Sequence, residues 1–116
     1  TRTHLEGASL ERADLRSARL RNANLSEANL SGAKLVRTDM SGANLSGANL
    51  SDADLSDANL WKANLTGANL LHANLTRALM AMANLKGANL KEADLTDTKL
   101  IKTELNDTIL PEGFEE

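Results

Sequence analysis

Histidine and cysteine, the residues most often used in catalysis and metal binding, are scarce in this chain. His4 and His72 are the only histidines, 68 residues apart, and there is no cysteine. A histidine-based metal site or acid–base pair is therefore not expected. The absence of cysteine excludes disulfides and thiolate-bound metals, and it is compatible with any redox compartment. The glycines recur with the spacing of a repeat, not between a strand and a helix, so no phosphate-binding loop is indicated. We assign no catalytic, metal-binding or cofactor-binding residue and expect no cofactor.

Three aspartates recur every forty residues and are the best candidates for a cation site. They are Asp14, Asp54 and Asp94. Lys34 and Asn74 lie midway between them, so a continuous acidic ladder is interrupted. We interpret the aspartates as part of a solvated surface.

Five apolar residues replace polar ones at neighbouring positions of the repeat described below, and we call them the apolar strip: Trp61, Leu79, Ala81, Met82 and Ile101. Trp61, Ala81 and Ile101 are spaced by twenty residues, and the other two lie beside them. Exposed apolar patches often mark interaction sites, and tryptophan is enriched at binding hot spots. The strip is the candidate partner-binding site. The alternative is scattered exposed hydrophobic residues, which are common on protein surfaces.

Arginines are concentrated in the first third of the chain, where acidic residues lie among them. A strip that attracts anions is one interpretation. We prefer a mixed, solvated face because both signs of charge are present. The residues concerned are Arg12, Arg16, Arg19, Arg21 and Arg37, with Glu11, Asp14 and Glu27.

A leucine at every fifth residue is the feature that must position all of these side chains. From Leu5 to Leu110, the 22 positions divisible by five are all Leu except Met40 and Met80. The residue two before each is Ala, or Thr at five positions: Thr3, Thr38, Thr98, Thr103 and Thr108. Repetition this regular is the signature of a repeat architecture.

The five-residue period fits neither a straight strand nor an α-helix. In a strand, side chains five apart point to opposite faces, and in a helix each step of five turns the side chain by about 140°. The chain must therefore bend once per repeat. Ala and Leu share one face of a short extended segment, and the pair that follows, such as Ser-Gly or Thr-Asp, favours a turn.

Columns of identical residues at multiples of twenty predict four five-residue sides per coil. Asparagines recur at 24, 44, 64 and 84, glycines at 7, 47, 67 and 87, and the two methionines of the repeat are forty apart. The 22 repeats then make about 5.5 coils, and stacking at ~4.8 Å gives a rod roughly 25 Å long. We expect backbone hydrogen bonds and asparagine ladders between coils to supplement leucine burial, so that each coil depends on its neighbours.

The motif Ala-(Asn/Asp)-Leu-x-x, which runs from about Thr3 to Leu110, resembles the pentapeptide-repeat family. The resemblance implies an all-β fold, a right-handed quadrilateral β-helix. We expect one repeat domain over residues 1–110 and a C-terminal cap over 111–116. Pro111 cannot extend the hydrogen-bond ladder, and Phe114 is placed to fold over the last leucines.

No cap precedes the first repeat, and Thr1 is not a methionine. The sequence thus allows a processed chain or one domain of a longer protein. A coil end exposes backbone edges that proteins normally cover. We expect an end-to-end contact with another molecule or a fused domain to cover this end of the stack, with simple exposure of the end as the alternative.

Composition and charge exclude several classes of function. The 116 residues are 41% hydrophobic, with Trp61 and Phe114 as the only aromatic residues, so the core must be built from stacked leucines. The net charge of −3 divides into +2 for residues 1–40 and −5 for the rest, and neither half is basic enough for direct nucleic-acid binding. No apolar run is long enough for membrane insertion, and no signal peptide precedes the repeats.

We therefore expect a non-enzymatic scaffold or protein-interaction module, with a protein partner. The family resemblance implies one alternative, a DNA-mimic regulator of a type II topoisomerase. That role needs a long acidic surface, which the first coils lack. An enzyme is the third and least supported alternative. The resemblance implies a bacterial protein; the cytoplasm is the expected location, with the periplasm and the thylakoid lumen as alternatives.

Overall fold

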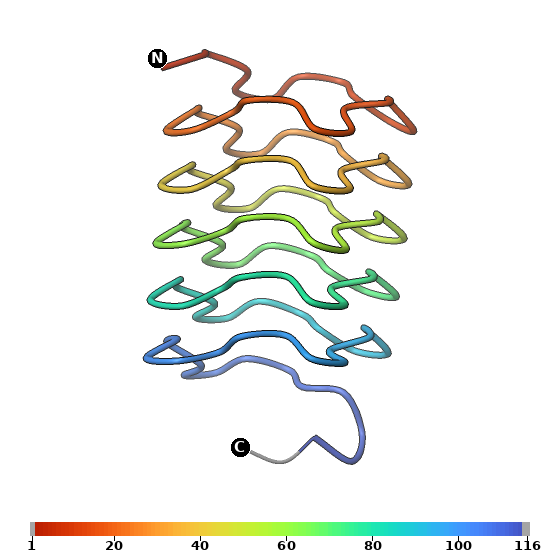
Figure 1. Ribbon diagram of the computed structural model, residues 1–116, viewed down its shortest axis with the longest axis vertical. Coiled ribbons are helices and arrows are strands. Elements are labelled where there is room, and N and C mark those ends of the chain that lie inside the picture. The colour runs from red at the N-terminus through yellow and green to blue at the C-terminus, as the bar shows by residue number, and fades with distance from the viewer. Residues whose placement is uncertain (1, 115–116) are drawn as a thin grey trace.

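The computed structural model describes residues 2–114, which wind into a stack of four-sided coils with no helix (Figure 1). No extended run is longer than a single bridging residue. Instead, 18 isolated parallel bridges each join a residue to the one twenty positions later, from His4–Asn24 to Asn89–Ile109. The predicted right-handed quadrilateral β-helix with a twenty-residue coil is confirmed. No helix in the described part of the chain could span a membrane.

Three backbone hydrogen bonds per repeat hold successive coils together, two along each side and one at each corner. The leucine N–H donates to the carbonyl oxygen of the residue before the leucine of the next coil, as from Leu45 to Asn64. The Asn64 N–H donates back to the Ala43 carbonyl oxygen at 2.9 Å. The backbone polar groups of each side thus depend on the coils above and below, as expected for a solenoid.

Each corner is a turn whose second residue has a positive φ. The turn closes with a hydrogen bond from the alanine N–H to the preceding leucine carbonyl, 3.0 Å from Ala48 to Leu45. Fifteen non-glycine residues hold φ between 55° and 61° at this position. None of the fifteen is β-branched, which agrees with the steric cost of the left-handed region for such side chains. Gly67, with φ of 67°, avoids that cost.

The interior is filled by the repeated alanine and leucine side chains. From Ala23 to Leu90 these side chains are at most 1% exposed, and Met40 and Met80 are fully buried in leucine positions. Leucines in the first and last coils, such as Leu10 and Leu105, are half-buried because no coil covers them on one side. The core is therefore continuous along the axis and thinnest at its ends.

The predicted asparagine ladders are wrong. The Asn64 Oδ1 atom accepts a hydrogen bond from the Thr66 N–H, two residues ahead, at 3.0 Å, and the same contact recurs from Asn24 to Asp94. No asparagine side chain within residues 2–114 bonds to the asparagine of an adjacent coil. The turn brings the N–H of the residue two positions ahead close to the side-chain oxygen, so this oxygen bonds within its own turn and not to the next coil. This contact needs only an acceptor, which explains why Asp replaces Asn freely here.

Inward threonines remain satisfied in the core. The Thr38 hydroxyl donates to the Leu15 carbonyl oxygen at 2.9 Å, and Thr98 donates to the Leu75 carbonyl oxygen at 2.8 Å. Thr103 and Thr108 make the same contact. Threonine can therefore replace the inward alanine without leaving a buried hydroxyl unpaired.

The molecule measures 34 × 24 × 22 Å. Its two shorter dimensions are nearly equal, as a square coil requires. The longest exceeds the predicted ~25 Å, in part because the segment after Leu110 continues beyond the last coil (Figure 1).

Candidate interaction surface

The apolar strip lies along one corner of the coil stack. Backbone hydrogen bonds place its members above one another: the Lys62 N–H donates to the Ala81 carbonyl at 3.1 Å, and the Met82 N–H donates to the Ile101 carbonyl at 2.9 Å. Leu79 bridges to Lys99 in the following coil. The structure therefore brings together the residues that the sequence pattern grouped.

Three members of the strip expose large apolar surfaces. The exposed fractions are 39% for Trp61, 47% for Met82 and 66% for Ile101. Leu79 and Ala81 are half-buried between them. The fourth large exposed hydrophobic residue, Ile109, is in a different column, outside the strip.

The Trp61 ring is held at the surface by its neighbours. Its backbone N–H donates to Asn59 Oδ1 at 3.0 Å, the same capping contact that polar residues make at this position of the repeat. The Lys62 ammonium nitrogen lies 4.6 Å from the ring centroid, in a cation–π contact. The turn therefore uses only the backbone of Trp61, and its ring is free of any role in the core.

Two carboxylates at one other corner are engaged within the coil stack. Arg16 bonds to Asp14 at 2.6 Å and lowers the pKa of that carboxyl from its ordinary value of 3.8 to about 2. The Asp57 pKa is lowered by hydrogen bonds from the Arg77 guanidinium, which lies one coil further on. Both pairs are exposed to solvent, so they add little to stability.

A stack of three titratable side chains was missed by the sequence analysis. The His72 ring lies between carboxylates of the adjacent coils, with Nε2 2.6 Å from Glu92 and Nδ1 3.4 Å from Asp52. All three residues share one column at twenty-residue spacing, so the column pattern could have identified them. Within the described residues, no three such side chains are arranged to hold a metal ion.

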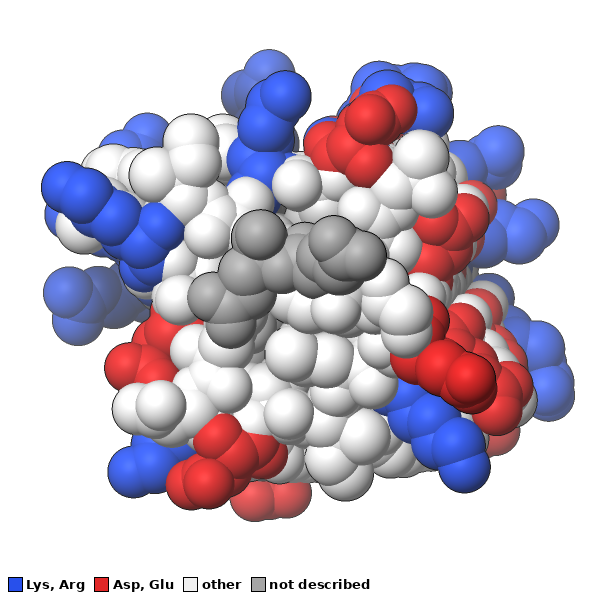
Figure 2. Space-filling model, turned by 90° about the horizontal axis from the view of Figure 1, so that it is seen from below, with Lys and Arg blue, Asp and Glu red and all other residues white. Residues whose placement is uncertain are grey.

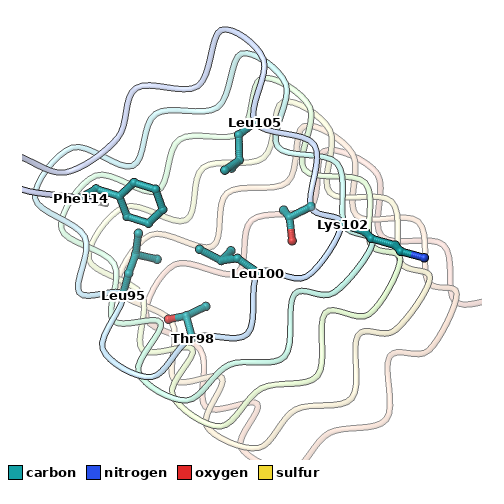
Figure 3. A pocket seen from close by; sticks show the side chains of 7 residues that line it. Leu95, Thr98, Leu100, Lys102, Leu105 and Phe114 are labelled. Carbon is teal, nitrogen blue, oxygen red and sulfur yellow. The ribbon is translucent and has the colours of Figure 1, made fainter. Parts of the chain in front are cut away.

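The C-terminal end of the stack carries the predicted cap residues. The Phe114 N–H donates to the Pro111 carbonyl at 3.2 Å, and both side chains are half-buried. Phe114 lines a cavity of about 530 Å³ with the half-buried Leu95, Leu100 and Leu105 (Figure 3). Charged side chains surround this end, and the described surface at its centre carries few (Figure 2). Residues 115–116 of the predicted cap lie outside the described residues.

Comparison with known proteins identifies the repeat. The family model for pentapeptide repeats matches in eight copies, over residues 1–32, 23–61, 43–81 and 80–111. Comparison with curated protein sequences gives no significant match.

Solved structures share the fold. A pentapeptide repeat protein from the Arabidopsis thaliana thylakoid lumen is 42% identical over 83% of this chain and 63% of its own, with a TM-score of 0.63. HetL, a pentapeptide repeat protein involved in heterocyst differentiation regulation from the cyanobacterium Nostoc sp. strain PCC 7120, is 32% identical over 97% of this chain and 66% of its own, with a TM-score of 0.55. The chain thus spans just under two thirds of the length of either structure.

Proposed function

Because the chain belongs to the pentapeptide-repeat family, we propose that it is a non-enzymatic scaffold that binds a protein partner through the apolar strip. The observation that carries this proposal is the exposure of Trp61, Met82 and Ile101 at turn positions stacked along one corner. Elsewhere along the repeat these positions mostly hold polar residues or glycine.

The fold does not explain the apolar identities of these three residues. At the same position as Trp61, the Ser51 N–H and hydroxyl both bond to Asn49 Oδ1, so a serine satisfies this turn more completely than tryptophan does. Met82 holds a φ of 61°, a conformation that suits glycine better. Side chains that the turns do not need, gathered on one surface, fit a binding role.

The test replaces the strip with residues that the chain itself uses at equivalent positions. The variant Trp61→Ser, Met82→Gly, Ile101→Ser keeps every backbone hydrogen bond and should fold at least as stably as the wild type. Proteins captured from a lysate of the native host by immobilised wild type should be lost with this variant. The matched control is Leu71→Ser, which removes a partly exposed leucine from another corner.

Two results would contradict the proposal. One is a set of captured proteins that is unchanged by the triple variant. The other is equal loss with the Leu71→Ser control, which would mean that capture follows general surface hydrophobicity.

We do not extend the proposal to regulation of a topoisomerase. The plasmid-mediated fluoroquinolone resistance protein QnrB1 is 20% identical to this chain with a TM-score of 0.46, too distant to support an argument about function. A DNA mimic needs a long acidic surface, and the corner with the apolar strip carries lysines at Lys62, Lys99 and Lys102.

We also propose that Pro111 and Phe114 cap the C-terminal end. The Phe114 ring lies beside Leu95 and lines the same cavity as Leu105, which supports a role in covering the last layer of leucines (Figure 3). Burial of an aromatic ring against this layer should stabilise the last coil.

A further inference from the structure

Basic residues are concentrated along the corner that carries the apolar strip, and we call this set the basic corner. Bridges and backbone hydrogen bonds place three columns of residues at this corner. They run at twenty-residue intervals through Arg19, Arg21 and Arg2. Six basic side chains and one acidic side chain stand there, a formal charge of +5 in a chain of net charge −3. The members are Arg2, Arg19, Arg21, Lys62, Lys99 and Lys102, with Asp39 as the acid.

None of these basic side chains is neutralised within the described part of the molecule. The ion pairs between residues 2 and 114 involve Arg16, His72 and Arg77, all at other corners. All six basic residues of the corner are exposed. Their charge is therefore available to a partner.

The single acid at the corner is already engaged in its own turn. Asp39 Oδ1 accepts hydrogen bonds from the Ser41 hydroxyl at 2.8 Å and from the Ser41 N–H at 3.1 Å. These bonds, with a smaller effect from Arg21, lower the pKa of Asp39 below its ordinary value. Asp39 takes the capping role that asparagine or aspartate has throughout the repeat, without an ion pair to the nearby arginines.

An open groove lies between one end of the basic corner and the neighbouring corner, and three arginines line it. Arg19, Arg21 and Arg37 line an open groove of about 550 Å³ together with Asp39. The lysines Lys99 and Lys102 stand at the other end beside Ile101, and Trp61 and Met82 lie in the coils between the two ends. The surface is thus basic at both ends, and its exposed apolar side chains run from the Trp61 coil to the end that carries the lysines.

We propose that this corner binds an acidic polypeptide segment in extended form, with carboxylates at both ends and apolar side chains between them. This inference rests on the proposed function and adds the chemistry of the partner. From Arg21 to Ile101 there are four coil steps, about 19 Å at ~4.8 Å each, which an extended segment of about six residues spans. Attraction between the carboxylates of the segment and the basic residues at both ends of the corner sets the position of the segment, and the apolar strip buries the apolar side chains of the segment.

The surface fits a polypeptide better than a single-stranded nucleic acid. Nucleobases bind by stacking on aromatic side chains, and the strip has one aromatic residue, Trp61. The aliphatic Leu79, Met82 and Ile101 suit the apolar side chains of a peptide. Binding of an oligonucleotide in place of a peptide is an outcome that the experiment distinguishes.

The experiment begins with selection from a phage-displayed library of random peptides. Selected peptides should combine aspartate or glutamate with leucine, isoleucine or phenylalanine, and a synthetic peptide of the selected sequence is the probe. Because Trp61 is the only tryptophan, its fluorescence reports binding at the strip directly. Affinity should fall steeply as salt reduces the Debye length from about 10 Å at 0.1 M to about 3 Å at 1 M.

Charge reversal separates this inference from the proposed function. Two double variants reverse the charge at the two ends of the corner: Arg19→Glu with Arg21→Glu, and Lys99→Glu with Lys102→Glu. Each double variant should weaken peptide binding at least about tenfold. Lys86→Glu with Lys91→Glu makes the same charge change at other corners and should weaken binding less than about twofold. The repeat already holds glutamate at each equivalent position, as at Glu6, Glu27 and Glu104, so folding is preserved.

Four results would overturn the inference. Two concern the library: it yields neutral or basic peptides, or it yields no binding peptide. The third is an equal loss of peptide affinity in all three double charge reversals. The fourth is quenching of Trp61 fluorescence by a single-stranded oligonucleotide but by no acidic peptide. If the triple strip variant abolishes binding and the reversals do not, the strip is the site and its partner is not acidic. If neither changes binding, the proposed function fails as well.

Discussion

Truncation of a central leucine should cost far more stability than the same truncation at the end of the stack. Leu55 is fully buried between the coils above and below, and Leu105, in the last coil, is half-buried. Leu55→Ala removes buried methyl groups and leaves a cavity that the stacked backbones cannot close, so it should cost about 3 to 5 kcal/mol. Leu105→Ala should cost about 1 to 2 kcal/mol, because that side chain already meets solvent.

The assay is urea unfolding of both variants, followed by circular dichroism and by Trp61 fluorescence. At roughly 4 °C per kcal/mol, Leu55→Ala should also lower Tm by about 12 to 20 °C. Leu55→Met is the control and should cost less than about 1.5 kcal/mol, since Met40 and Met80 already fill leucine positions without exposure.

Equal costs at the two positions would refute this reasoning. They would mean that the last coil is as well covered as the centre, either by the segment after Leu110 or by association of two molecules. A cost below about 1 kcal/mol at Leu55 would mean that the stack collapses around cavities and that its rigidity is overstated.

Four further predictions concern the turns, the surface charges and the cap. Asn64→Ala removes the side-chain acceptor of a turn N–H and should cost about 1 kcal/mol in urea unfolding, with Asn64→Asp close to neutral; equal loss in both would contradict the capping role. Gly67→Ala should cost about 1 kcal/mol by thermal melting, through φ strain alone, because an added Cβ meets nothing within 4 Å; no loss would remove the strain argument. The carboxyl of Asp14 should titrate by NMR with a pKa of about 2, and this pKa should return toward 3.8 in Arg16→Ala. Any stability from this pair is therefore present above about pH 4 and lost as the pH falls toward 2. An Asp14 pKa that is unchanged in the variant would show that Arg16 is not the cause. Phe114→Ala should destabilise the protein by about 1 to 2 kcal/mol and speed amide hydrogen exchange mainly in the last coil, and exchange that is unchanged there would rule out a cap.

The sequence predicts the architecture almost completely, for a physical reason. A leucine every five residues can be buried only if the chain bends once per repeat, and the columns of Asn and Gly then require four sides per coil. The inward positions of Leu55, Met40 and Thr38 follow directly. Few folds are so strongly constrained by a single period.

The role of asparagine could not be read from the pattern. A recurring Asn is compatible both with a ladder along the stack and with a cap on its own turn. Only the backbone geometry decides, because it places the Thr66 N–H within 3.0 Å of Asn64 Oδ1. The left-handed conformation of non-glycine residues such as Met82 was hidden for the same reason.

The basic corner was not recognised because charge was grouped along the chain, which set Arg19 and Arg21 among nearby acids and left out the distant lysines. Halves of the sequence average all four corners, and each half then looks mixed. A solenoid sorts side chains by their position within the coil, so Arg19 and Lys99 share a corner although they are eighty residues apart. Arg16, close to Arg19 in sequence, lies at another corner and pairs with Asp14. Charge in a repeat protein should be summed by column.

The most direct test of the proposed interaction is site-specific photo-crosslinking in the native host. A photoreactive phenylalanine derivative replaces Trp61 in one variant and Leu71 in the other. The proposal predicts a discrete crosslinked protein at position 61 that is absent at position 71. No adduct at position 61, or the same adducts at both positions, would contradict a partner-binding role for the apolar strip.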